Sequence, residues 1–257
     1  MHEREIAAKV ARLAGEELMA RLQEGGEKQI QQKDFGEQVT NFDREINQFI
    51  IEELQAHFPE HDIVTEEADV IDAKSEHDRW FVDPIDGTNN FVRHIPLYGV
   101  SIGYERKGVM SAGAIYDPLN KILFSGSLED GAFVGKEPTK VSDIDQLSNS
   151  MVFEGYGYAP EYKARHVNIV AELNKRTKFR RNLGTAALML AYVARGDVDG
   201  LILTGIKAWD CAAGAVLIRA AGGKVTNYQD EDWSAADEMI IASNGKIHEE
   251  LLEIVHI

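Results

Sequence analysis

Residues 80–88 of this chain read Trp-Phe-Val-Asp-Pro-Ile-Asp-Gly-Thr. Their apolar beginning predicts a buried strand over residues 79–82. Pro84 restricts the residue before it to an extended conformation, because the proline ring crowds the preceding backbone. We therefore expect the strand to end on two carboxylates, those of Asp83 and Asp86, at one edge of a sheet.

The residues after these carboxylates favour an anion site. Gly87 permits close approach of a ligand to the backbone, and a short helix can begin after Thr88. The N–H groups at a helix start point at an anion, and hard oxygen ligands beside them suit Mg²⁺-assisted phosphoryl chemistry. Asp-Pro and Asp-Gly are also common turn signals, so the stretch by itself is equally consistent with a plain turn.

The composition of the chain narrows the classes of function. The 257 residues carry a formal net charge of -16 with a pI of about 4.9, whereas a nucleic-acid footprint would need a basic face. An acidic protein can still bind a phosphate when its carboxylates hold metal ions beside it. The single cysteine, Cys211, excludes an internal disulfide and fits a reducing compartment. Because no run of about 18 apolar residues occurs, we expect a cytoplasmic protein that binds neither nucleic acid nor a membrane.

The pattern of the chain predicts two halves, residues 1–145 and 146–257, with a polar boundary over 138–150. In the first half, two amphipathic helices precede a polar loop over 69–77 and two adjacent hairpins, which predict an antiparallel sheet. In the second half, strands alternate with helices, so helices are expected on both sides of sheets. The elements predicted there are strands over 151–155, 179–183, 198–203, at 225 and over 239–242, and helices over 161–175, 185–194, 210–221 and 247–254.

Three other stretches bring polar or small residues to the ends of predicted elements. Glu66 follows a short strand, where a carboxylate can bridge metal ions or position a water, although a solvated acidic loop is the plainer interpretation. Asp210 follows Trp209 at the start of an apolar helix, where it can complete a metal site or simply cap the helix. The small residues Gly-Thr-Ala-Ala at 184–187 open another helix and allow either a close ligand or tight helix packing.

Together these stretches resemble the inositol monophosphatase family of Mg²⁺-dependent, Li⁺-sensitive phosphatases. They occur in the family's order and with near-family spacing over about residues 33–223. The pairing of Asp-Pro-Ile-Asp-Gly-Thr at 83–88 with Trp-Asp-x-Ala-Ala-Gly at 209–214 is specific. The matching stretches are Val39 to Asp43, Glu66 with Glu67, Trp80 to Thr88 with Asn90 and Phe91, Val100 to Gly103, Gly184 to Ala187, Trp209 to Gly214, and Ala221 to Gly223.

The resemblance implies an α+β fold, a layered α/β/α/β/α sandwich, with the metal site where the two halves meet. Glu66, Asp83 and the Ile85 carbonyl would hold a first Mg²⁺ ion. Asp83, Asp86 and Asp210 would hold a second, and Glu66 would help with a weaker third.

The resemblance also implies catalytic and substrate-binding residues. Thr88, backed by Asp43, would orient or deprotonate the attacking water together with Glu66. Because metal-bound water is a usable nucleophile near neutral pH, no covalent phosphoenzyme is needed. The substrate-binding residues would be Gly87 and Thr88, whose N–H groups would cradle the phosphate, and Gly184, Thr185, Ala186 and Lys207.

Substrate choice is where the chain departs from the inositol-hydrolysing members. Those enzymes carry a Glu seven residues before the Asp of Trp-Asp, and this chain has Leu203 there, which cannot bond a hydroxyl. Lys207 either adds positive charge for a second phosphate or another anion, or is an ordinary surface lysine. The distance from Lys33 to Asp43 is also about one residue shorter than in the family.

We predict Mg²⁺-dependent hydrolysis of a small phosphate monoester, with inositol 1-phosphate as the family default, by a homodimeric protein. The alternatives within the superfamily are a fructose-1,6-bisphosphatase and a phosphatase for 3′-phosphoadenosine 5′-phosphate or NADP. A regulatory binding protein is the alternative from another class.

Overall fold

The structure is a computed structural model that describes residues 2–25, 28–32, 38–71 and 78–256. Lys33 and residues 72–77 of the predicted loop lie outside these ranges. Within them, no helix has both the length and the apolar composition needed to cross a bilayer.

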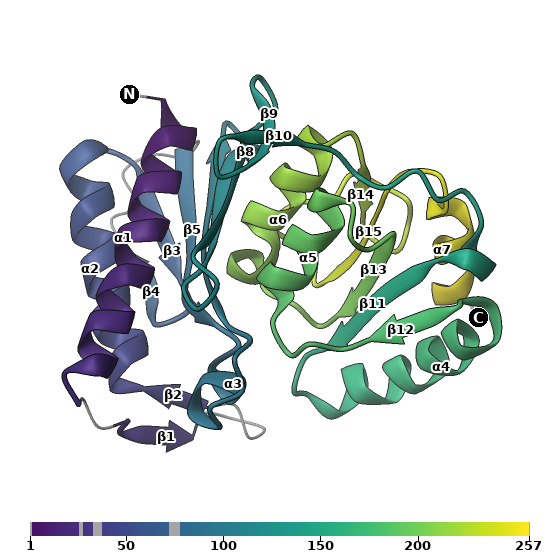
Figure 1. The fold of residues 1–257 in the computed structure, drawn as a ribbon, viewed down its shortest axis with the longest axis horizontal. Helices are drawn as coiled ribbons and strands as arrows, with labels where there is room; N and C mark the ends of the chain where they lie inside the picture. The colour runs from purple at the N-terminus through teal and green to yellow at the C-terminus, as the bar shows by residue number, and fades with distance from the viewer. Residues whose placement is uncertain (1, 26–27, 33–37, 72–77, 257) are drawn as a thin grey trace.

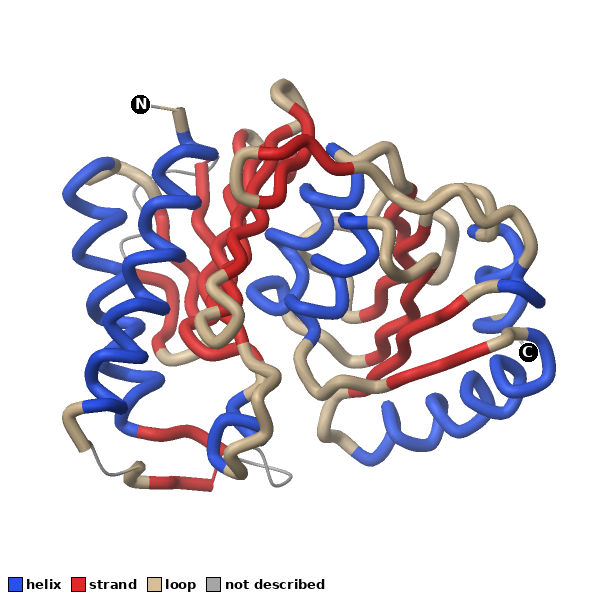
Figure 2. The backbone as a smooth tube through the Cα atoms, in the orientation of Figure 1, coloured by secondary structure: helices blue, strands red, loops and turns tan. Residues whose placement is uncertain are grey.

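Five layers follow one another across the molecule, which confirms the predicted α/β/α/β/α sandwich (Figures 1 and 2). Two helices cover the outer face of the first sheet, two lie between the sheets, and two cover the outer face of the second sheet. In that order they are α1 (Glu3–Gln23), α2 (Asn41–His57), α5 (Ala186–Arg195), α6 (Ala208–Ala220), α4 (Pro160–Arg176) and α7 (His248–Val255).

The first sheet has the strand order β10-β9-β8-β7-β6-β5-β3-β4. Its neighbours are antiparallel except for β3 and β5, which run parallel. The two predicted hairpins are confirmed as β6 with β7 and β8 with β9. The strands are β3 (Asp62–Thr65), β4 (Ala68–Ile71), β5 (Asp78–Asp86), β6 (Gly99–Arg106), β7 (Val109–Asp117), β8 (Ile122–Ser127), β9 (Gly131–Val134) and β10 (Glu137–Thr139).

The second sheet has the order β12-β11-β13-β15-β14, with β11 parallel to both of its neighbours and β15 antiparallel to both of its own. Its strands are β11 (Met151–Tyr156), β12 (Phe179–Arg181), β13 (Gly200–Thr204), β14 (Lys224–Thr226) and β15 (Met239–Ser243). Beside the sandwich lie a two-stranded sheet of β1 (Ile30–Gln32) and β2 (Gln38–Thr40), the short helix α3 (Thr88–Val92), and a 3-10 turn, η2 (Leu147–Asn149).

The predicted bounds in the second half shift by one or two residues, and three differences concern the surroundings of the site. The first part of the predicted loop over 69–77 is strand, because β4 pairs with β3. The strand predicted over 79–82 continues to Asp86, since the backbone beyond Pro84 still pairs with β6. Helix α6 begins at Ala208, so Asp210 lies in its first turn rather than at its first position.

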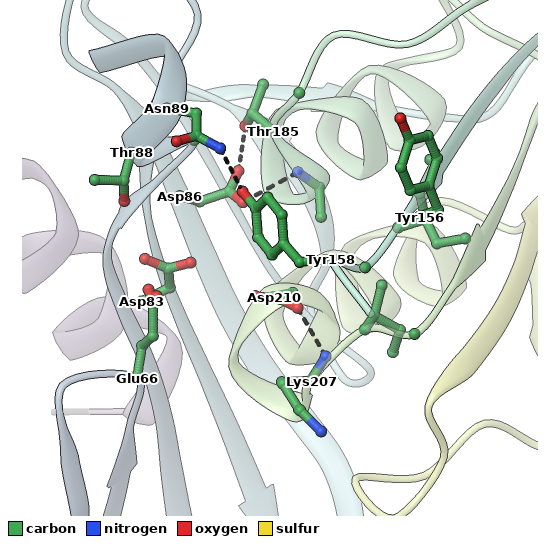
Figure 3. Close-up of a pocket in the computed structure, with 18 of the residues that line it drawn as sticks. Glu66, Asp83, Asp86, Thr88, Asn89, Tyr156, Tyr158, Thr185, Lys207 and Asp210 are labelled. Carbon is green, nitrogen blue, oxygen red and sulfur yellow. Dashed lines mark hydrogen bonds between the residues drawn. The ribbon is translucent and has the colours of Figure 1, made fainter. Parts of the chain in front are cut away.

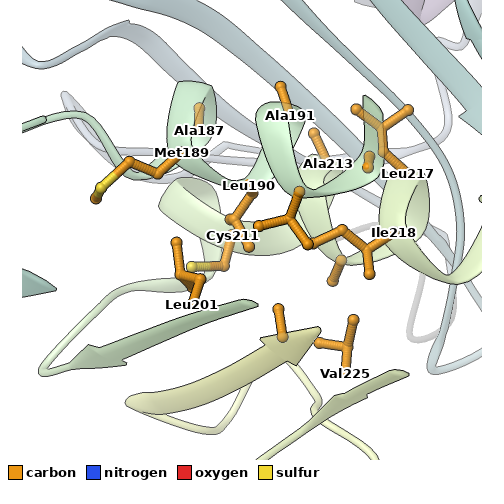
Figure 4. Packing of buried hydrophobic residues seen from close by; sticks show 14 of the residues in the cluster. Ala187, Met189, Leu190, Ala191, Leu201, Cys211, Ala213, Leu217, Ile218 and Val225 are labelled. Atoms are coloured by element: carbon orange, nitrogen blue, oxygen red, sulfur yellow. The ribbon is translucent and has the colours of Figure 1, made fainter. Parts of the chain in front are cut away.

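The middle layer fixes the distance between the sheets. Helix α6 lies so close to β6 and β7 that a Cβ atom at Gly103 would come within 2.5 Å of the Ala212 Cβ, and one at Gly113 within 2.8 Å of the Ala213 Cα. On the other side, α5 and α6 pack over the apolar second sheet (Figure 4). Small residues on both surfaces therefore bring the start of α6 to the edge of the first sheet.

The two predicted halves, 1–145 and 146–257, stay a prediction. The strands of the first sheet all precede residue 140, and those of the second sheet all follow residue 150. The helices between the sheets belong to the second half, yet α6 also packs on β5, β6 and β7. The two halves thus share one apolar middle layer.

Candidate active site

Three aspartates converge where β5 ends and α6 begins. One carboxylate oxygen from each of Asp83, Asp86 and Asp210 lies within 4.8 Å of the others. Asp83 and Asp86 are the first and last residues of the Asp-Pro-Ile-Asp stretch that ends β5. Asp210 comes from the first turn of α6. The structure therefore brings together two motifs that are about 125 residues apart in the sequence.

Glu66 joins this group through the parallel pairing of β3 and β5. Thr65 lies opposite Val82, so Glu66, which directly follows β3, lies beside Asp83 of β5. The Glu66 N–H donates to the Val82 carbonyl at 3.2 Å, which holds the Glu66 backbone against the end of β5. Figure 3 shows the Glu66 and Asp83 side chains pointing toward one another. The three aspartates and Glu66 form what we call the carboxylate cluster.

The electrostatics of the carboxylate cluster are unfavourable for a protein without cations. Asp83 is only 2% exposed, and burial raises the pKa of its carboxyl well above the ordinary value. The negative charges of Glu66, Asp86, Asp210 and Asp43 raise this pKa further. Crowded buried acids are stable in the ionised form when cations lie between them, and carboxylate oxygens are the ligands that Mg²⁺ prefers.

Asp86 is fixed by the start of α5. Its carboxylate accepts hydrogen bonds from the Thr185 hydroxyl and from the N–H groups of Ala186 at 3.0 Å and Ala187 at 2.9 Å. Burial raises the pKa of Asp86 to about 6, although these hydrogen bonds oppose the shift. The segment predicted to contact substrate, from Gly184 to Ala186, thus lines the cavity and also orients a cluster carboxylate.

Thr88 and Asp43 form a hydrogen-bonded pair beside the cluster. The Thr88 Oγ1 lies 3.1 Å from Asp43 Oδ1 and 3.0 Å from the Ile85 carbonyl oxygen. The other Asp43 oxygen accepts the Thr40 N–H at 2.7 Å and the Thr40 hydroxyl, in the capping box that begins α2. Burial raises the pKa of Asp43, and the Thr40 hydrogen bonds oppose that shift. The helix cap therefore fixes Asp43 through Oδ2, which leaves Oδ1 to accept from the Thr88 hydroxyl.

Gly87 is required by its surroundings. Its φ of 94° lies in the left-handed region, which favours glycine. A Cβ atom there would come within 3.0 Å of the Leu97 carbonyl oxygen and 3.2 Å of the Gly184 carbonyl oxygen. Gly87 thus lies between the loop before β6 and the loop before α5, at the edge of the cavity. The phosphate cradle assigned to the N–H groups of Gly87 and Thr88 stays a prediction.

Lys207 and Leu203 lie on the side of the site formed by the second half. The Lys207 N–H donates to Asp210 at 2.7 Å, whereas its ammonium pairs with Glu238 at 3.0 Å. Figure 3 shows the Lys207 side chain pointing away from the carboxylate cluster. Leu203 lines the cavity and is 2% exposed. An anion-binding role for Lys207 therefore requires the ammonium to turn from Glu238.

These residues line a cavity of about 710 Å³. One wall holds the carboxylate cluster with Thr88, and another is formed by the end of β11, the start of α4 and the loop between them. Tyr156 in β11, Tyr158 in the loop and Tyr162 in α4 line this wall, and none of them is among the predicted site residues. The Tyr-Gly-Tyr repeat directly after a predicted strand is the signal that could have identified Tyr156 and Tyr158.

Comparison with known proteins agrees with this geometry. A family model described as the inositol monophosphatase family matches residues 2–257. An inositol-1-monophosphatase of Mesorhizobium japonicum is 35% identical over 253 residues, which cover 97% of this chain and 94% of that protein. The Nus factor SuhB of Escherichia coli K12 is 33% identical over 249 residues, which cover 96% of this chain and 93% of that protein.

A solved structure leads to the same family. The crystal structure of the extragenic suppressor protein suhB from Bartonella henselae superposes with a TM-score of 0.92 at 32% identity, covering 98% of this chain and 97% of that one. The family match extends over the whole described sandwich and includes both motifs of the carboxylate cluster. The chain belongs to the inositol monophosphatase family.

Proposed function

We propose that this protein hydrolyses small phosphate monoesters in the presence of Mg²⁺. The observation that carries the proposal is the convergence of Asp83, Asp86 and Asp210 in one cavity with Thr88, whose hydroxyl contacts the buried Asp43. Membership of the inositol monophosphatase family supports a phosphatase activity.

The chemistry of the donor set fits Mg²⁺ ions. The cluster offers hard oxygen atoms in a buried place where each negative charge raises the pKa of its neighbour. When bound, Mg²⁺ supplies a Lewis acid that lowers the pKa of water and neutralises charge on the phosphoryl group. The residues that would hold two or three ions are Glu66, Asp83, the Ile85 carbonyl, Asp86 and Asp210.

The remaining groups would act on the water and the phosphate. When the Thr88 hydroxyl donates to Asp43, its lone pairs are left to accept a hydrogen bond from a water in the cavity. Glu66, whose side chain points to the same place as Asp83, would accept the proton that this water loses. The N–H groups of Gly87 and Thr88 would orient the phosphate oxygens at the other edge of the cluster.

The choice among phosphate monoesters is a finer proposal. Inositol 1-phosphate is the substrate implied by the resemblance and by the name of the Mesorhizobium relative. Leu203 does not supply the carboxylate that bonds hydroxyls in the inositol-hydrolysing enzymes. Fructose 1,6-bisphosphate, 3′-phosphoadenosine 5′-phosphate and NADP therefore belong in the same test.

The test is release of inorganic phosphate from these compounds, with Mg²⁺ and with EDTA, by the wild type and by Asp210→Asn. We expect Mg²⁺-dependent release that Asp210→Asn loses and that Asp143→Asn retains. Asp143 is a suitable control because it is an exposed carboxylate paired with Lys140 and Lys246. Equal release by Asp210→Asn and the wild type would contradict the proposal.

A regulatory role is the second candidate, because several relatives carry the name Nus factor SuhB. Under this alternative the protein would act through a macromolecular partner, although its net charge of -16 disfavours direct contact with nucleic acid. Capture of one protein at stoichiometric amounts, by a wild type that releases no phosphate, would favour it. The homodimer and the cytoplasmic location stay predictions, and sedimentation in solution tests the first.

A further inference from the structure

Helix α3 of the first half contacts the second half through two neighbouring asparagines. The Asn89 Nδ2 donates to the Tyr158 hydroxyl oxygen at 2.8 Å, in the loop before α4. Asn90, which is half-buried, reaches the loop between β12 and α5, residues 182–185, which we call the α5 loop. The proposed chemistry does not involve Asn90, so its contacts need a separate explanation.

The Asn90 amide group donates to the backbone of both halves. Its Nδ2 lies 2.8 Å from the Leu97 carbonyl oxygen, in the loop before β6, and 2.8 Å from the Leu183 carbonyl oxygen, in the α5 loop. The Gly184 carbonyl oxygen is a third acceptor at 3.3 Å. Because an amide nitrogen carries two protons, both are engaged by these carbonyls. One hydrogen bond thus stays within the first half and another crosses to the second.

The α5 loop and the Asn90 side chain are closely packed. The φ of Gly184 is 69°, in the left-handed region, and a Cβ atom there would come within 3.1 Å of the Asn90 Nδ2. The Asn182 side chain supports the loop from within the second half, because its Oδ1 accepts the Gly184 N–H at 2.9 Å. Gly184 is therefore held on its N–H side by Asn182 and on its carbonyl side by Asn90.

The residue after Gly184 begins the contacts to the carboxylate cluster. Asp86 accepts the Thr185 hydroxyl and the next two backbone N–H groups of α5 (Figure 3). Asp86 and Asn90 lie four residues apart in the first half, and they bind residues 183–187 of the second half at opposite ends. The polarity is complementary at both ends, since the carboxylate accepts N–H groups and the amide donates to carbonyl groups. The stretch that orients Asp86 is thus also bound by Asn90.

We propose that Asn90 is a positioning residue of the proposed metal centre. Its hydrogen bonds hold the α5 loop so that Thr185 and the N–H groups after it keep Asp86 in the orientation that binds Mg²⁺. In this role Asn90 acts through the loop and contacts neither the ion nor the phosphate. The inference rests on the proposed function, because it concerns a ligand of the proposed Mg²⁺ site. Replacing groups that orient metal ligands changes metal affinity or activity by about 10–100-fold.

The test measures the Kd of Mg²⁺ by calorimetric titration of the metal-free wild type, Asn90→Ala and Asn90→Asp. It also measures kcat and KM at saturating Mg²⁺ for the ester that the wild type hydrolyses fastest. We expect both substitutions to raise Kd and to lower kcat by about tenfold or more, with KM within about twofold of the wild type. Asn90→Asp keeps the volume of the side chain but turns oxygen atoms toward the carbonyl groups, so it separates hydrogen-bond donation from space filling.

The outcomes distinguish this inference from the proposed function. Wild-type values of Kd and kcat in Asn90→Asp would overturn the inference and leave the proposed function standing. Absence of both Mg²⁺ binding and phosphate release in the wild type would overturn both.

A double-mutant cycle tests whether Asn90 acts through the α5 loop. Thr185→Val removes the hydroxyl that bonds Asp86 and keeps the size of the side chain. If Asn90 and Thr185 act on Asp86 through the same stretch, the double variant Asn90→Ala/Thr185→Val should have a Kd within about threefold of that of the weaker-binding single variant. Effects that multiply would contradict the coupling.

Two further variants separate positioning from a loss of stability. Asn149→Ala is the matched control, because Asn149 is an exposed asparagine that bonds to Gln146 and does not line the cavity. It should bind Mg²⁺ as the wild type does. Asn182→Ala replaces an exposed residue that supports the same loop, so it should raise Kd by about threefold even if the Asn90 variants do not fold. A wild-type Kd in Asn182→Ala would contradict the role of the loop.

Discussion

Asp83 and Glu154 are two buried acids with opposite surroundings. They are 2% and 3% exposed, and each lies on a strand of one of the two large sheets. Burial alone raises the pKa of both carboxyls. Around Asp83 the neighbouring acids raise the pKa further, whereas around Glu154 hydrogen bonds and charges from His166 and Arg180 lower it below the ordinary value.

The difference favours a structural role for Glu154 and supports the proposed ligand role of Asp83. Glu154 has its partners within the chain, the His166 ring at 2.6 Å and the Arg180 guanidinium at 2.6 Å. Asp83 is surrounded by other carboxylates, so the ionised cluster requires cations from solution. Two equally buried carboxyls thus have pKa values shifted in opposite directions, and the sign of the neighbouring charges decides the direction.

The largest expected effect is that of Asp83→Asn on catalysis. We expect Mg²⁺-dependent phosphate release to fall by about a thousandfold, because the substitution removes a carboxylate that we propose as a ligand of two ions. The free energy of unfolding in EDTA should not fall, since the substitution removes a buried charge that its neighbours repel. Kinetics and urea unfolding of the same preparation measure both. A large loss of stability with activity retained would reverse the roles that we give to the two acids.

Glu154→Gln should give the opposite pair of results. We expect the free energy of unfolding to fall by about 2 kcal/mol, because His166 and Arg180 lose a buried charged partner. The loss should stay moderate since Arg180 is one-third exposed and can turn to water. The kcat should change less than in Asp83→Asn, and urea unfolding with steady-state kinetics compares the two variants. A stability equal to that of the wild type would show that the Glu154 pairs contribute little.

The contributions of the two regions to the free energy of unfolding should depend on pH in opposite ways. Asp86 has its pKa raised from 3.8 to about 6, so the folded state binds more protons than the unfolded state between these values. Without Mg²⁺, this group therefore lowers stability as pH rises through that range. The lowered pKa of Glu154 has the opposite effect, since its contribution is lost only as pH falls below its ordinary range.

Mg²⁺ binding should offset the stability that the folded state loses at the carboxylate cluster as pH rises. At a free concentration about a hundredfold above Kd, binding stabilises the folded state by about 2.7 kcal/mol, which raises Tm by about 5–10 °C. We expect most of this rise at about pH 7.5 and little of it at about pH 5, where protons compete for the carboxylates. Thermal unfolding with Mg²⁺ and with EDTA measures the difference. An equal rise at both values would argue against ionised cluster ligands.

The smallest effect is expected from Lys207→Met. The Lys207 side chain is 55% exposed and is paired with Glu238, so its charge is partly screened and partly neutralised. We expect the KM of the best substrate to rise by about twofold to threefold with little change in kcat. Initial-rate kinetics of the variant and the wild type measure both KM and kcat. A rise of tenfold or more would make Lys207 a principal anion contact.

Much of the site follows from the sequence because its residues lie in or next to short motifs. The bend from Asp83 to Asp86 is fixed by Pro84 and Gly87, whose backbone preferences are local. Thr40 and Asp43 likewise form a cap that is local to the start of α2. The resemblance to a known family adds what local patterns do not contain, namely that Asp210 joins a bend about 125 residues earlier.

The rest depends on tertiary contacts that no local pattern specifies. Asp210 reaches the cluster because α6 packs against Gly103 and Gly113 on another sheet. The Asn89–Tyr158 bond joins residues 69 positions apart, and the Glu154 pairs depend on how α4 lies on β11. Strand β4 is another case, because the polar residues that follow it in the sequence indicate a loop and the pairing with β3 makes residues 68–71 a strand.

The most direct test of the carboxylate cluster as a metal centre is calorimetric titration of the metal-free protein with Mg²⁺ at about pH 7.5. The wild type, Asp83→Asn and Glu154→Gln should be compared at equal concentration. We predict saturable binding by the wild type and by Glu154→Gln, and loss of that binding in Asp83→Asn. Binding by Asp83→Asn equal to that of the wild type, or no binding by the wild type, would contradict the account.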